Sequence, residues 1–112
     1  HKKIHIEGEI ARDMAKDIIL PQAVEAYSSA LKANEMALNQ GLPALDSYAK
    51  PLGEGIKKLL AAIEVMEKAL ASKHEDILNG MIDLRLVVDA LEKIVPDEKW
   101  PLPKYREMLF IY

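Results

Sequence analysis

Apolar residues recur at helical spacing along most of the chain. From residue 42 onward the pattern is strict, with apolar positions alternately four and three apart: Leu45, Ala49, Leu52, Ile56, Leu59, Ile63, Met66 and Leu70. After a turn at residues 72–75 the same spacing returns at Ile77, Met81, Leu84, Val88, Leu91 and Val95. This heptad spacing is typical of helices that pack side by side. We therefore predict two long helices, the second ending at Val95-Pro96-Asp97.

A third long segment runs from about Ile4 to Gln40. Its large apolar residues form one stripe: Ile6, Ile10, Met14, Ile18, Val24, Tyr27, Leu31 and Leu38. Pro21 removes one helical hydrogen bond and clashes with the preceding turn. Because the stripe stays in phase across Pro21, we predict one long helix, kinked near Pro21, with this stripe as its core face. Gly41 is the expected stop.

These segments together predict the fold class. Two antiparallel helices cannot bury both seams alone, so the first helix supplies the third wall. We predict an all-α fold, an up-down helical bundle of three long helices plus a short C-terminal helix, in which residues 1–112 form a single domain. Pro51, Gly53, Gly55 and Gly80 are unusual inside helices and leave the boundaries near them open. Gly80 costs about 1 kcal/mol relative to Ala in a helix.

The C-terminal segment from Trp100 to Phe110 concentrates the aromatic residues. It holds the only Trp and the only Phe of the chain. Pro101 and Pro103 stiffen its backbone, and Pro103 suits the first position of a short helix. Burying each ring stabilises by roughly 2 kcal/mol or more. We expect this tail to close onto the rest of the chain or onto a partner.

Further apolar residues flank the two seams, at Leu60, Leu78, Ile82 and Leu86. Two interpretations of them remain open. They could fill a core with three walls, or they could mark contact with a parent domain or a neighbouring subunit.

Composition narrows the function classes. The chain has 112 residues, 50% of them hydrophobic and 29% charged, which fits one folded domain. A net charge of −3 argues against a nucleic-acid partner. No apolar run approaches the length of a membrane span, and the absence of cysteine fits a cytoplasmic location. Because the chain begins at His1 without a leader, we expect it to be part of a longer polypeptide.

Candidate metal and acid–base groups are sparse. His1 and His5 have a spacing that can bind a metal, but they need further ligands. Glu7 and Glu9 cannot converge on one helix face. The sequence His74-Glu75-Asp76 falls at a predicted turn, where the two acids would offset a helix dipole. No Glu-x-x-His pair of the di-iron type occurs.

The basic residues also have ordinary interpretations. Arg12, Arg85 and Arg106 are the only arginines, and an anion-binding bundle enzyme would direct such cations into its core. We expect Arg85 to face outward or to reach another subunit. Lys57-Lys58 lies one turn after Glu54 on a solvated face. Without a phosphate loop, a catalytic triad or a cysteine, we predict no catalytic, cofactor-binding or metal-binding residue in this chain.

Two separated motifs resemble a known enzyme family. The stretch Ile4-x-Ile6-Glu7 with Met14-Ala15-x-x-Ile18-Ile19-Leu20-Pro21-x-Ala23-Val24, followed by Tyr27, resembles the start of the C-terminal helical region of type III glutamine synthetases. The ending Trp100-Pro101-Leu102-Pro103-x-Tyr105-Arg106-Glu107-Met108-Leu109-Phe110 looks like the terminus of the same enzymes. The match spans nearly the whole chain, with residues 42–80 merely compatible.

The resemblance implies a parent enzyme that condenses glutamate with ammonia, uses ATP and Mg or Mn, and assembles into large rings. It implies that the catalytic motifs lie upstream, so no catalytic position transfers to this chain. The expected role is a non-catalytic structural and assembly domain, inactive alone, whose partners are the catalytic domain of the same chain and neighbouring subunits of a homo-oligomer. One alternative is a free-standing helical module that binds a partner helix. Another is a small bundle enzyme, which would need a charged, concave interior.

Overall fold

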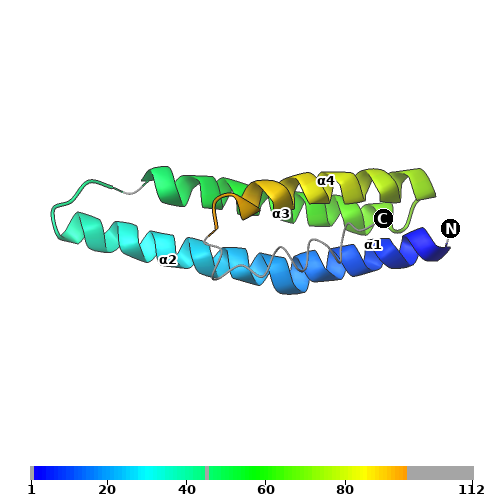
Figure 1. Ribbon diagram of the computed structural model, residues 1–112, viewed down its shortest axis with the longest axis horizontal. Helices are drawn as coiled ribbons and strands as arrows, with labels where there is room; N and C mark the ends of the chain where they lie inside the picture. The colour runs from blue at the N-terminus through cyan, green and yellow to red at the C-terminus, as the bar shows by residue number, and fades with distance from the viewer. Residues whose placement is uncertain (1, 45, 96–112) are drawn as a thin grey trace.

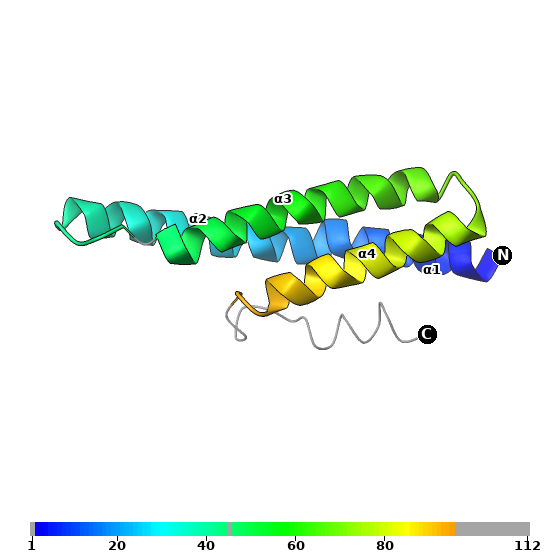
Figure 2. The ribbon, with the colours of Figure 1, turned by 90° about the horizontal axis from the view of Figure 1, so that it is seen from above.

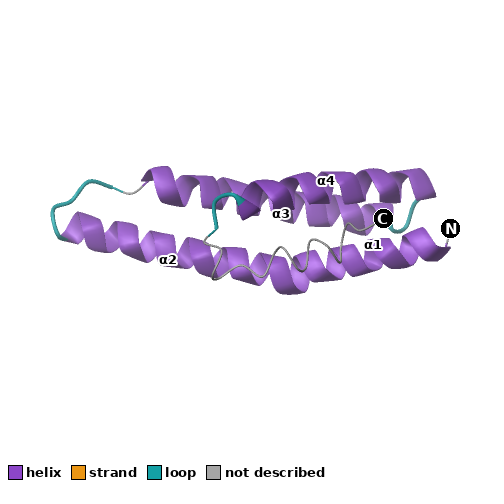
Figure 3. Cartoon of the chain, viewed as in Figure 1, coloured by secondary structure: helices purple, strands orange, loops and turns teal. Residues whose placement is uncertain are grey.

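The computed structural model describes residues 2–44 and 46–95, and all of the regular structure there is helical. The elements are α1 (Lys2–Met14), a π-helical turn η1 (Ala15–Ile19), α2 (Leu20–Asn39), α3 (Asp46–Ala69) and α4 (His74–Glu92) (Figures 1 and 3). The predicted all-α class is confirmed. The predicted short C-terminal helix and the aromatic tail lie outside the described residues.

The helices form two regions of different thickness. α1, η1 and α2 make one continuous rod, α3 returns along it, and α4 turns back beside α3 and α1 (Figures 1 and 2). α4 is the shortest of the three long segments, and the far part of α2 extends past its end (Figure 1). We call residues 26–44 and 46–50 the two-helix arm, and the remaining described part the three-helix half.

The core of the three-helix half is made of large aliphatic side chains from α3 and α4. Every residue of the predicted α4 seam is buried. Of the α3 seam, Ile56 is half-buried and Leu45 lies outside the described residues, whereas the others are buried: Ala49, Leu52, Leu59, Ile63, Met66 and Leu70. Both heptad seams are therefore confirmed as core faces.

The core face predicted for the first helix is wrong. Five residues of that stripe have between 44% and 55% of their surface exposed: Ile6, Ile10, Val24, Leu31 and Leu38. The buried face consists mainly of alanines: Ile4, Ala11, Ala15, Ile19, Ala23, Ala26, Ala30 and Ala37. Alanine lets the backbone of this helix approach α3 and α4 closely. The buried stripe is therefore the one with the smaller side chains, although both stripes have similar spacing.

The π-helical turn keeps the alanine face in register. Ala11, Ala15, Ile19 and Ala23 follow one another at intervals of four, and an α-helix with 3.6 residues per turn would rotate such a row by about 40° at each step. The N–H of Leu20 donates to the carbonyl of Ala15, five residues back, and this wider turn absorbs the drift. Pro21 follows directly, so the predicted disturbance near Pro21 takes the form of a π turn just before it.

The glycines inside helices lie where side chains of neighbouring helices come closest. A Cβ added to Gly8 would lie 2.8 Å from Cε of Met66, and one added to Gly80 would lie 2.9 Å from Sδ of the same residue. Met66 thus fills the space between α1 and α4. Gly55 faces Leu91 in the same way, at 2.5 Å from its Cδ2. Each of these glycines lowers the stability of its own helix, but it also allows a neighbouring helix to pack closely.

The turn after α2 is a Schellman motif. Gly41 has a φ of +76°, and the N–H of Leu42 donates to the carbonyl of Ala37 over 2.8 Å. This confirms Gly41 as the stop of the first helix. α3 then begins at Asp46 and includes Pro51 near its start.

Candidate interaction surface

His5 ties α1 to the end of α3. Its Nε2 donates to the backbone oxygen of Leu70 over 3.0 Å, and its Nδ1 lies 3.0 Å from Oε1 of Glu9. Leu70 directly follows α3, where helix carbonyls lack intrahelical partners. Both ring nitrogens therefore have partners within the chain. His1, the other predicted metal-ligand candidate, lies outside the described residues.

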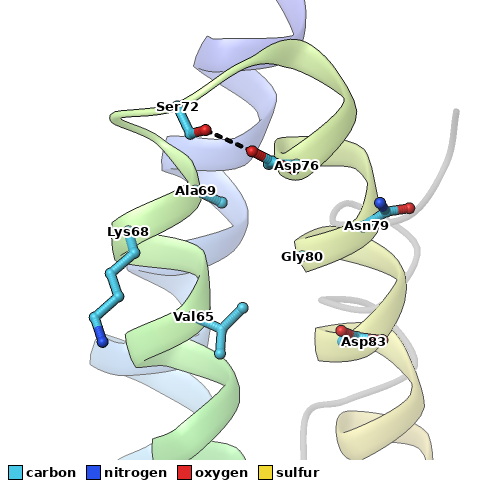
Figure 4. A pocket seen from close by; sticks show the side chains of 8 residues that line it. All are labelled: Val65, Lys68, Ala69, Ser72, Asp76, Asn79, Gly80 and Asp83. Carbon is cyan, nitrogen blue, oxygen red and sulfur yellow. Dashed lines mark hydrogen bonds between the residues drawn. The ribbon is translucent and has the colours of Figure 1, made fainter.

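The acidic residues after the turn between α3 and α4 occupy the positions that the sequence predicts. Glu75 and Asp76 lie in the first turn of α4, directly after His74. There they oppose the positive end of the helix dipole. Ser72 Oγ donates a hydrogen bond to the carboxylate of Asp76 across the turn (Figure 4). This contact shapes the start of α4.

A shallow pocket of about 320 Å³ lies between the end of α3 and the start of α4. Its lining is mixed, with apolar groups on its floor and polar groups around them (Figure 4): Val65, Lys68, Ala69, Ser72, Asp76, Asn79, Gly80 and Asp83. Within residues 2–44 and 46–95, no three His, Asp or Glu side chains lie close enough to hold a metal ion.

The two arginines of the described part each lie near a carboxylate of their own helix. Arg12 Nε donates to Asp13 Oδ1 over 2.9 Å, and Arg85 Nε lies 3.8 Å from Asp89 Oδ2. The Arg85 side chain is 57% exposed, so it faces outward, which is one of the two placements that the sequence predicts. Arg106 lies outside the described residues.

The interior of the described residues contains no buried polar or charged side chain. A bundle enzyme that binds an anion needs cations directed into its core. The described part of the chain therefore does not provide the charged interior that the small-enzyme alternative requires.

One flank of α2 exposes large apolar side chains. Val24, Leu31 and Leu38 are 47%, 44% and 54% exposed. Leu20 and Tyr27 continue the flank and are half-buried, and the Tyr27 ring packs near Gly53 of α3. The flank thus follows the edge between α2 and α3. We name these five residues the outer flank.

The spacing of the outer flank fits a helical partner. Its members are separated by four, three, four and seven residues, which is a heptad pattern independent of the buried alanine face. Leu60 on α3 is 51% exposed and lies on the flank of α3 turned to the rod. Contiguous apolar surface of this kind marks interaction sites in soluble proteins.

Comparison with known proteins gives this surface a context. The chain is 27% identical to a type-3 glutamine synthetase of Dictyostelium discoideum over 133 aligned positions, which cover 99% of this chain and 18% of that protein. It is 30% identical to a glutamine synthetase of Bacteroides fragilis (strain YCH46) over 132 positions, covering 96% of this chain and 18% of that protein. The chain matches a segment of type III glutamine synthetases. The resemblance predicted from the two motifs is confirmed.

The match has a limited extent on the side of the relatives. The chain spans about one-fifth of the length of the glutamine synthetases that it matches. The aligned stretches are longer than the 112 residues of this chain, so both relatives carry additional residues within the matched region. No protein-family model matches the chain, and no solved structure matches it. Within the described residues, none of the helices has the length and apolar character needed to cross a membrane.

Proposed function

We propose that this chain is the non-catalytic C-terminal assembly domain of a type III glutamine synthetase, an ATP-dependent ligase that joins glutamate and ammonia. The observation that carries the proposal is the similarity of nearly the whole chain to 18% of the length of two glutamine synthetases. In such an enzyme the upstream part would bind ATP, Mg or Mn and glutamate. The cysteine-free composition fits a cytoplasmic enzyme.

The structure supports a binding role for the arm in particular. In the three-helix half, α3 and α4 bury large side chains in a core, whereas in the arm the buried residues of α2 are alanines and its leucines point outward. Leu31, Met36, Leu38 and Leu42 expose between 44% and 67% of their surface. Burying such side chains contributes about 25 cal/mol per Å² of apolar area. A partner that covers the arm would therefore gain free energy from apolar area that the isolated arm leaves exposed to water.

We assign the outer flank to contact with a neighbouring subunit. The arm projects beyond the end of α4, so its surface is accessible to a second chain (Figure 1). The three-helix half remains for contact with the catalytic domain of the same chain, through exposed residues such as Ile6. Both contacts belong to the proposed homo-oligomer.

The reading frame upstream of His1 tests the proposal directly. We expect it to encode a glutamine synthetase catalytic domain, and we expect the longer polypeptide to form glutamine from glutamate, ammonia and ATP. The 112-residue chain should fold without ligase activity and without tight ATP binding. A start codon directly upstream of His1, or glutamine formation by the 112-residue chain, would contradict the proposal.

The second candidate is a free-standing helical module that binds a partner helix. The heptad spacing of the outer flank favours it, because an amphipathic helix docks through residues at such intervals. The same reading frame decides between the two candidates. A complete gene that encodes these 112 residues alone supports the module and removes the enzyme domain.

A further inference from the structure

A second apolar surface, distinct from the outer flank, lies along the edge between α1 and α4. On α4, three residues spaced four apart are exposed: Leu78 (38%), Ile82 (57%) and Leu86 (63%). On α1, Ile10 is 48% exposed and Met14 is half-buried. We call these five residues the α1/α4 edge.

The contacts of α4 show which way its exposed stripe faces. Asn79 and Asp83 line the pocket shared with α3, and Val87 and Ala90 line a second hollow against α3. Leu78 and Ile82 each precede one of these α3-facing residues and so lie about 100° around the helix from them. The exposed stripe is therefore turned away from α3.

The contacts of α1 show which of its residues lie next to α4. His5 faces α3 through its hydrogen bond to Leu70, and Met14 lies nine residues later, half a turn around the helix from His5. Gly8 of α1 abuts Ile77 of α4, so the two helices lie side by side, and they run in the same direction (Figure 2). Ile10 and Met14 thus border α4 on the side where Leu78 and Ile82 emerge.

We propose that residues 96–112 of this chain return along α4 and dock on the α1/α4 edge through their aromatic residues. The chain continues for 17 residues after Val95, which is 4% exposed and belongs to the core cluster where α4 ends. These residues carry Trp100, Tyr105 and Phe110, the aromatic groups that the sequence predicts to be buried.

The available length fits this path. Residues 96–102 in extended form reach at most about 23 Å, more than the distance of about 10 Å between packed helix axes. A helix over residues 103–112 would be about 15 Å long, and the stripe from Leu78 to Leu86 is about 12 Å long. The predicted helix therefore covers the stripe when it runs antiparallel to α4.

The alternative path, onward along the arm, offers a poorer surface. On the side of α2 away from the outer flank, the residues beside the alanine face are polar: Gln22, Glu25 and Ser29. Ser29 lies two residues beyond Tyr27, about 200° around the helix from the side that faces α3. Aromatic rings gain more free energy on the apolar α1/α4 edge than on these polar groups.

Trp100 is the only tryptophan of the chain, so its fluorescence reports the docking. In the 112-residue chain we expect Trp100 emission to be blue-shifted from that of the chain unfolded in urea, and to be protected from acrylamide. Ile82→Lys should move the emission to the unfolded position and raise the quenching constant to the unfolded value. Leu38→Lys, which places the same charge on the outer flank, should leave both unchanged. Far-UV circular dichroism checks that both variants remain helical.

Three results would overturn the proposal. Trp100 emission at the unfolded position in the wild-type chain would show that the tail needs a surface outside this chain. Emission that becomes red-shifted on dilution would assign the tail to a second copy. Emission that responds to Leu38→Lys but not to Ile82→Lys would place the tail on the outer flank.

Discussion

The three-helix half and the two-helix arm differ in the residues that form their interiors. In the three-helix half, Leu59, Met66, Leu84 and Leu91 are fully buried, and glycines on facing helices make room for two of them. In the arm, the buried residues of α2 are Ala26, Ala30 and Ala37, while its leucines face outward. The first region is stabilised by its own core. Among the helices of residues 2–44 and 46–95, no third one packs on the second region, whose outward leucines form the surface that the proposed partner would cover.

This difference comes from α3 and α4, because the rod buries mainly alanines along its whole length. Where α4 is present, three helices enclose enough space for large side chains. Beyond its end, two helices approach closely only if small residues line the contact. The large residues of α2 are then left on the flanks, where they can bind a further helix.

Replacing a leucine by alanine should show the largest difference in stability between the two regions. Leu84→Ala removes a side chain with 0% exposure from the three-helix half and should lower the free energy of unfolding by about 2–5 kcal/mol. Leu31→Ala in the arm should change it by less than about 0.5 kcal/mol in the 112-residue chain. Urea denaturation followed by circular dichroism measures both. Equal losses would show that the arm has a core of the same kind.

Adding a methyl group at Gly55 should give the next largest effect. The added methyl group of Gly55→Ala meets Leu91, and overpacking of this kind costs about 1–3 kcal/mol. Higher helix propensity returns up to about 1 kcal/mol, so we expect a net loss in urea denaturation. Ala61→Gly, at an exposed site of the same helix, measures the propensity term alone. A net gain for Gly55→Ala would mean that Leu91 repacks freely.

Removal of the tie between α1 and α3 should have a smaller effect. His5→Phe keeps a ring but loses the hydrogen bond to Leu70, and a bond of this type contributes about 0.5–1.5 kcal/mol. Hydrogen exchange at the end of α3 should accelerate together with the loss of stability. The neighbouring exposed Ile6→Ala serves as the control. If His5→Phe behaves like this control, the contact with Leu70 does not hold the helices together.

Surface ion pairs should matter least. Lys68 Nζ lies 3.4 Å from Glu64 Oε1, and both side chains are largely exposed. Lys68→Ala should therefore change the free energy of unfolding by less than about 0.5 kcal/mol, and added salt should shrink the difference. Denaturation at low and high salt checks this. A larger, salt-insensitive loss would point to packing of the Lys68 stem.

The seams of α3 and α4 could be predicted from sequence because each of these helices has one dominant apolar face. The sequence of the first helix has two candidate faces, and the larger residues indicated the wrong one. The signal for the correct face was the row Ala11, Ala15, Ile19 and Ala23 just ahead of Pro21. Its meaning depends on a π turn, which no local propensity specifies.

The surface was harder to predict than the core. Leu60, Leu78, Ile82 and Leu86 had two open interpretations, and the structure places all four at the surface. Which flank of a helix is exposed depends on the position and length of its neighbours. The end of α4 was predicted near Val95, but the place where this end lies along the rod, which leaves the arm with two of the described helices, follows from the tertiary arrangement.

Assembly of the proposed full-length glutamine synthetase is the most direct test of the subunit contact that we assign to the outer flank. Leu31→Lys places a charge on the outer flank, and Ser29→Lys places the same charge on the other side of α2, about 200° away. Sedimentation velocity should show that Leu31→Lys shifts the enzyme from the oligomer toward smaller species while Ser29→Lys keeps the wild-type oligomer. An unchanged oligomer for Leu31→Lys would contradict the assignment of the outer flank as a subunit contact.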